Sequence, residues 1–172
     1  MKPTHLAIAV SLFFAATSVL AQPVTDAQIA SIVVTANQVD IDAGELAASQ
    51  ASREDVRDFG KQMVTDHTGV NKQATDLVTA LNVTPQDNPT SQSLKAGGAQ
   101  NIATLKKLSG AAFDKAYIDH EVTYHQLVLK AVDQTLIPNA QNAELKALLV
   151  KGRPLFAAHL EHAKRLQAAL GK

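Results

Sequence analysis

The chain has 172 residues, of which 46% are hydrophobic, and its 16 basic side chains balance 16 acidic ones. It contains no cysteine, which excludes disulfides, thiolate zinc sites and iron–sulfur clusters, so any metal must be held by His, Asp or Glu. The balanced charge argues against nucleic acid as a partner, because binding to a polyanion requires an excess of basic groups.

The first 21 residues have the three parts of an export signal. Lys2 lies in a short polar region, an apolar stretch follows over residues 6–20, and small residues precede a predicted cleavage after Ala21. Cleavage leaves 15 basic and 16 acidic residues, since Lys2 is removed. We therefore expect a signal peptide at 1–21 and one soluble, exported, periplasmic domain at 22–172 with no integral membrane span. An uncleaved anchor is the alternative.

The rest of the chain repeats apolar residues at steps of three and four, which predicts an all-α domain. Thr25 and Gln28 form a capping box that starts helix one, and the inner stripe of this helix includes Asp40. Ser52 is predicted to start helix two, whose apolar line includes His67 and ends at the turn-forming residues 82–90.

A long connector leads to the second pair of helices. It carries a weaker predicted helix over residues 94–108 and is long enough to cross the whole domain. Helix three is expected over 111–136, closed by Pro138, and helix four should follow with a kink at Pro154. The predicted fold is an antiparallel four-helix bundle with a long crossover that contains a short helix.

Ionisable residues interrupt the apolar stripe of every long helix: Asp40, His67, Glu121 with His125, and His159. Their distances from the helix ends differ by only about 6 Å, so they are expected to share one layer of the bundle. Glu121 and His125 are four residues apart and therefore lie on one helix face.

Three interpretations of this layer are open. The first is a structural hydrogen-bond network that also includes Tyr117 and Tyr124. The second is a metal site, since neutral imidazole and carboxylate suit transition metals and bundles hold such ligands on facing helices. The third, acid–base catalysis, lacks a Gly-x-Ser-x-Gly nucleophile motif or a phosphate-binding loop, so no catalytic residue and no organic cofactor are assigned.

Four further polar residues receive weaker assignments. His120 is expected at the boundary of the core, and His162, three residues after His159, is a reserve ligand. Glu45 and Asp66 lie beside the stripes and are predicted to be solvated charges.

Three segments resemble the helix signatures of the bacterial domain-of-unknown-function family 4142, which is grouped with the ferritin-like superfamily. They are residues 56–67 (VRDFGKQMVTDH), residues 113–117 (FDKAY) followed by His125, and residues 154–160 (PLFAAHL). The resemblance marks His67, His125 and His159, and also Asp40, where relatives tend to have glutamate.

The resemblance implies a ferritin-like topology in an exported protein, with iron handling as an analogy only. Di-iron bundles use Glu-x-x-His motifs, and this sequence has none, because Glu121 and His125 are one residue further apart. We therefore predict one transition-metal ion at His67, His125 and His159 with Asp40 or Glu121. The alternative is a non-enzymatic envelope stress or interaction protein, with an envelope protein as partner and a purely structural layer.

Overall fold

Residues 23–171 are described by a computed structural model, and the predicted export signal lies outside them. This part of the chain is helical and contains no strand, which confirms the all-α prediction. The elements are α1 (Asp26–Gln50), α2 (Glu54–Ala80), α3 (Pro89–Leu105), α4 (Gly110–Ala131), the π-helical turn η1 (Val132–Leu136), α5 (Ile137–Asn139) and α6 (Ala143–Leu170).

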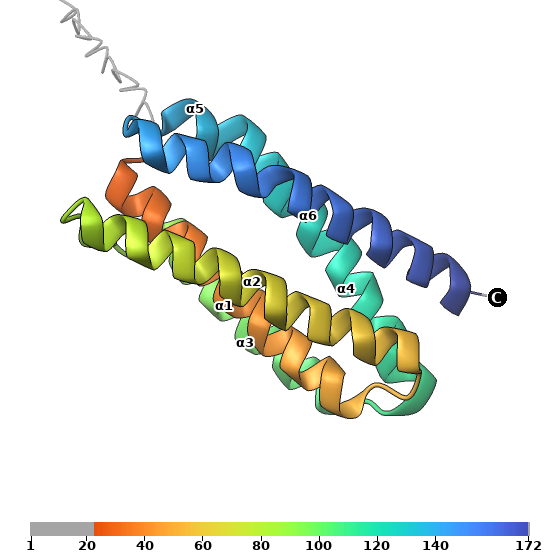
Figure 1. Ribbon diagram of the computed structural model, residues 1–172. Helices are drawn as coiled ribbons and strands as arrows, with labels where there is room; N and C mark the ends of the chain where they lie inside the picture. The colour runs from red at the N-terminus through yellow and green to blue at the C-terminus, as the bar shows by residue number, and fades with distance from the viewer. Residues whose placement is uncertain (1–22, 172) are drawn as a thin grey trace, which may run out of the picture.

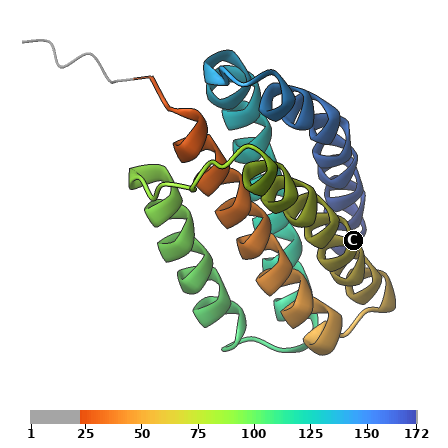
Figure 2. The ribbon, with the colours of Figure 1, turned by 60° about the vertical axis from the view of Figure 1, so that its left-hand side comes forward.

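Two antiparallel helix pairs, α1 with α2 and α4 with α6, lie against each other (Figure 1). The contacts between the pairs run from α2 to α6 and from α1 to α4. Helix α3 lies along α1 and runs in the same direction, so the chain returns from the end of α2 before it enters α4 (Figure 2). The connector thus crosses the length of the domain.

The starts of α1 and α2 are fixed in different ways, α1 by a residue next to it in sequence and α2 by a distant one. Thr25 caps α1 through the predicted box with Gln28. Helix α2 begins at Glu54, two residues after the predicted start, because the turn before it is held by Asp114 of α4. The carboxylate of Asp114 accepts from the backbone N–H and hydroxyl of Ser52 and from the backbone N–H of Arg53.

Two predicted boundaries were wrong, and proline explains both. Helix α3 begins at Pro89, five residues before the predicted start, because proline fits the first helical position and Asn88 caps the helix. Helix α4 ends at Ala131, and the chain continues through η1 past Pro138 to Asn139. Pro138 lies in the first turn of a new segment, where its missing N–H costs nothing. Pro154 lies inside α6, which continues beyond it.

The close contact between α1 and α2 depends on two glycines. A Cβ atom added at Gly44 would lie 2.8 Å from the carbonyl oxygen of Gly60, and one added at Gly60 would lie 2.8 Å from that of Gly44. None of the helices in residues 23–171 is both long and apolar enough to cross a membrane.

The apolar core consists of two clusters. One is centred on Phe59, Phe113 and Tyr117, towards the turn between α1 and α2. The other includes Ile29, Leu149 and neighbours towards the opposite end. The layer of ionisable side chains lies between these two clusters.

Candidate metal centre

All five ionisable residues predicted to share a layer lie in one buried cluster. Asp40 comes from α1, His67 from α2, Glu121 and His125 from α4, and His159 from α6. None of them is more than 3% exposed. Four different helices therefore place their polar residues together in the core.

Asp40 is in contact with two of the rings. Its Oδ2 atom lies 2.8 Å from Nε2 of His67 and 3.4 Å from Nε2 of His125. Neither contact is aligned as a hydrogen bond, and both carboxylate oxygens of Asp40 lack a hydrogen-bond partner within residues 23–171. The carboxylate of Glu121 lies beside His125, with 3.4 Å between Oε2 and Nδ1, and its two oxygens also lack a hydrogen bond there.

Each of the three rings has one nitrogen in contact with an oxygen atom outside the ring cluster. The pairs are His67 Nδ1 with Asn37 Oδ1 (2.7 Å), His125 Nδ1 with the backbone carbonyl of Glu121 (3.0 Å), and His159 Nε2 with Asp66 Oδ2 (2.9 Å). A carbonyl or carboxylate oxygen can only accept, so each of these nitrogens carries the ring proton. The amide of Asn37 is oriented for this role, because its Nδ2 donates to the carbonyl of Val33 at 2.8 Å.

In a ring that carries only this one proton, the opposite nitrogen has a free lone pair. These nitrogens are His67 Nε2, His125 Nε2 and His159 Nδ1, and the described part of the chain offers none of them a hydrogen bond. The ring centroids are 5.1–5.7 Å apart. A buried polar atom without a partner costs about 1–3 kcal/mol, so this arrangement needs a proton or a cation.

The pKa values of the two carboxyl groups in the cluster, Asp40 and Glu121, are shifted in opposite directions. Burial raises the pKa of Asp40, but the His67 and His125 imidazoles lower it further, to about 2. Burial, and then the charge of Asp40, raise the pKa of Glu121 well above its usual range. Burial also lowers the pKa of His159, to about 4. The cluster thus favours the ionised form of Asp40 and the neutral forms of Glu121 and His159.

The donor set fits a transition metal. His67, His125 and His159 form one group whose candidate ligand atoms lie within 4.8 Å of one another, and Asp40, Glu121 and His125 form another. Rings that bind one ion through nitrogens at about 2.0–2.1 Å, with tetrahedral angles, have centroids roughly 5 Å apart. The observed spacing is close to this value. Metal-bound histidines also commonly donate their second N–H to a carbonyl or carboxylate, as all three do here.

Two residues of this arrangement were missed or misread in the sequence. Asn37 lies one helical turn before Asp40, and its polar character on the inner stripe was the available signal. Asp66 was predicted to be a solvated charge, which was wrong, because its side chain is only 29% exposed and contacts His159. Glu45 is exposed, as expected.

The remaining polar neighbours do not complete the cluster. The hydroxyl of Tyr124 donates to the carbonyl of Ala36 at 2.8 Å, whereas that of Tyr117 is buried with no hydrogen bond from residues 23–171. The reserve ligand His162 contacts Gln62 at 3.1 Å and lies outside both candidate groups. His120 is partly buried at the edge of the core, as predicted.

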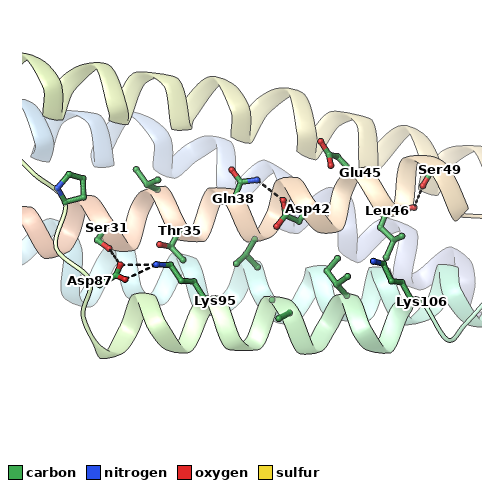
Figure 3. Close-up of a pocket in the computed structure, with 16 residues that line it drawn as sticks. Ser31, Thr35, Gln38, Asp42, Glu45, Leu46, Ser49, Asp87, Lys95 and Lys106 are labelled. Carbon is green, nitrogen blue, oxygen red and sulfur yellow. Dashed lines mark hydrogen bonds and ion pairs between the residues drawn. The ribbon is translucent and has the colours of Figure 1, made fainter.

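A wider groove lies elsewhere on the domain. A groove of about 930 Å³ runs between α1 and α3 (Figure 3). An ion pair of 3.0 Å between Lys95 and Asp87 closes one end of it, and Ser31 donates to the same carboxylate. The candidate metal ligands do not line this groove.

Comparison with known proteins identifies the family. A family model described as a domain of unknown function, DUF4142, matches residues 13–166. The chain belongs to the DUF4142 family. The match includes all five cluster residues and the two that orient the rings, so it agrees with the resemblance read from three segments of the sequence. No curated protein and no solved structure matches this DUF4142 chain.

Proposed function

We propose that the protein is an exported, periplasmic metal-binding protein that holds one divalent transition-metal ion. His67, His125 and His159 supply three nitrogen ligands, and Asp40 supplies a carboxylate. Glu121 lies beside them as a neutral carboxyl group or a further ligand. One observation carries the proposal. In each of the three rings one nitrogen contacts an oxygen acceptor, and the opposite nitrogen is buried and has no hydrogen bond within residues 23–171.

A proton is the competing occupant. A charged His67 would pair with Asp40 across 2.8 Å and relieve the closest contact in the cluster. That proton leaves the free nitrogens of His125 and His159 unsatisfied, however, and burial opposes charging either ring. One metal ion satisfies all three nitrogens and the carboxylate together, which is why we favour it.

One ion is favoured over two. A pair of hard iron ions needs several bridging carboxylates, and di-iron bundles supply them from all four helices. In this cluster α2 and α6 contribute histidines, and only Asp40 and Glu121 provide carboxyl groups. Histidine-rich sites suit zinc, copper, nickel or a single iron.

The fold and the location belong to the same proposal. Two antiparallel helix pairs, joined by a connector that crosses the domain along α1, support a ferritin-like four-helix bundle in which α3 is part of the crossover. The charged, apolar and small-residue parts of residues 1–21 support export with cleavage after Ala21.

Elemental analysis tests the proposal. The exported protein is purified, loaded separately with zinc, copper, nickel and iron, freed of excess metal and analysed. We expect about one ion per chain with one of these metals, lost in His67→Ala and in His159→Ala. His162→Ala is the matched control, because this ring lies outside the cluster, and it should retain the ion.

The second reading, an interaction protein with a purely structural layer, makes the opposite prediction. It expects no stoichiometric metal in any preparation. Equal metal loss in His162→Ala and His159→Ala would also contradict the proposed site, since binding would then depend on a histidine outside the cluster.

A further inference from the structure

A narrow cavity leads to the candidate metal centre. It has a volume of about 240 Å³, and its inner end is formed by Asp40, His67 and His125. Its walls are almost entirely apolar and come from α1, α2, α3, α4, η1 and α6, with typical members Val33, Val70, Val128, Val132, Leu149 and Phe156. Leu127, which also lines the cavity, is 62% exposed, so an apolar side chain marks the solvent side.

Two irregular features of the backbone lie along this cavity. The π-helical turn η1 contributes Val132 and Leu136 to the wall, and such turns are rare and concentrate at functional sites. The other feature is Gly152, which lines the cavity from the middle of α6. A Cβ at this position would meet only the ring of Phe156, at 3.6 Å, so no close helix contact requires a glycine here. A helical glycine is destabilising, and its effect at this position is to leave the cavity open.

The dimensions fit an extended aliphatic chain. The wall residues of α1 run from Ile32 to Asp40, which lie about 12 Å apart along the helix. A cavity of about 150 Å³ holds benzene, with six heavy atoms, so 240 Å³ corresponds to roughly ten heavy atoms. A straight chain of eight carbons with a two-oxygen head group has this size and shape.

We propose that the protein binds an aliphatic monocarboxylate of about eight carbons, with its tail in the cavity and its carboxylate on the metal ion. This proposal rests on the proposed function, because the head group needs the ion. Without metal, the carboxylate would meet the carboxyl group of Asp40 at the inner end of the cavity.

Charge favours a monoanion over a neutral head group. Where Asp40 is the one ionised carboxylate of the chain on the ion, three neutral imidazoles and this carboxylate leave a divalent ion with one net positive charge. A buried net charge is costly in apolar surroundings, and one carboxylate cancels it. The face of the cluster that opens to the cavity is formed by Asp40, His67 and His125, so the head group reaches the ion from that side.

The test compares three probes on the zinc-loaded protein by titration calorimetry: octanoate, acetate and 1-octanol. Acetate has the head group without the tail, and octanol has the tail without the charge. Each buried methylene contributes about threefold to fourfold in affinity. We expect octanoate to bind at least 100-fold more tightly than acetate and at least tenfold more tightly than octanol, and metal-free protein to lose this preference for octanoate.

Gly152→Leu fills the cavity from α6, where leucine also favours the helix. It should abolish octanoate binding and retain zinc, and the milder Gly152→Ala should weaken octanoate less. Gly97→Leu is the matched control, because it replaces another helical glycine at a position with open space.

Each outcome of the test decides one point. Octanoate no tighter than acetate on zinc-loaded protein overturns the cavity proposal and leaves the metal site intact. Octanol as tight as octanoate overturns the carboxylate class. Absence of zinc, copper, nickel and iron alike in the elemental analysis refutes the proposed function, and the carboxylate proposal with it.

Discussion

Replacing Asn37 by leucine tests whether the proton position on His67 controls metal binding. Asn37 is 3% exposed, and its Oδ1 accepts the Nδ1 proton of His67 across 2.7 Å. Leucine has a similar volume but offers no acceptor. The ring proton is then expected to move to Nε2, which lies 2.8 Å from Oδ2 of Asp40, and there it blocks the lone pair that the metal needs.

The structure sets the expected magnitudes. Loss of the hydrogen-bond acceptor behind a metal ligand lowers metal affinity 10- to 100-fold, or about 1.4–2.7 kcal/mol. The metal-free variant loses the hydrogen bond to Asn37, and the proton on Nε2 then lies beside the carboxylate of Asp40, 2.8 Å away. Because a hydrogen bond is worth about 1 kcal/mol and the new contact offsets part of it, the free energy of unfolding should fall by no more than about 1 kcal/mol.

Two measurements check this prediction. Competition with a chromophoric chelator gives the metal affinity, and nitrogen NMR of the imidazole gives the protonated ring nitrogen in the metal-free protein. Asn101→Leu, in α3 and away from the cluster, is the control and should change neither. If Asn37→Leu moves the proton to Nε2 and metal still binds with wild-type affinity, the argument from the ring protons is refuted.

Three further substitutions test the cluster and the packing around it. Burial and the charge of Asp40 raise the pKa of Glu121 above its unfolded value of 4.5, so the metal-free protein should lose stability as the pH rises above 4.5. Glu121→Gln should remove that loss, so urea unfolding at pH 5.5, 6.5 and 7.5 must show a growing advantage of the variant. Asp114→Ala removes three hydrogen bonds at the start of α2 and should lower the free energy of unfolding by about 2–4 kcal/mol in the same assay. Gly44→Ala places a methyl group 2.8 Å from the carbonyl oxygen of Gly60 and should lower the free energy of unfolding by about 1–3 kcal/mol. Gly69→Ala, at a position in α2 with open space around it, should raise the free energy of unfolding by about 0.5–1 kcal/mol. Equal effects of the two glycine substitutions would contradict the close packing of α1 and α2.

The helices and the members of the cluster could be predicted because both follow from spacing along a single helix. A stripe with a period of three to four residues defines the inner face, and a His or Asp on that face must enter the core at a height set by its residue number. This is why Asp40, His67 and His159 were identified before the fold was known. The rise of the helix fixes their height almost independently of how the helices are connected.

The features that escaped prediction depend on neighbours from another helix. Whether Asp66 is solvated or contacts His159 is decided by the rotation of α2 against α6, which a single stripe does not determine. Asp114 caps α2 from α4 across 62 residues, so no signal near residue 52 reveals it. Pro89 was ambiguous for a different reason, since the same residue ends one helix and fits the first position of the next.

The position of the cluster gives a reason why the chain keeps buried polar atoms that lack hydrogen bonds and so lower its stability. The cluster lies between two apolar clusters of the core, so polar contacts take the place of apolar packing at the centre of the domain. A metal ion bound here would take a ligand from each of α1, α2, α4 and α6 and would join the two helix pairs at their centre. Binding at a thousand times the dissociation constant adds about 4 kcal/mol to the stability of the folded state, comparable with the cost of two or three unsatisfied polar atoms. The unpaired nitrogens and carboxyl oxygens are thus a liability in the metal-free chain and the source of stabilisation in the loaded one.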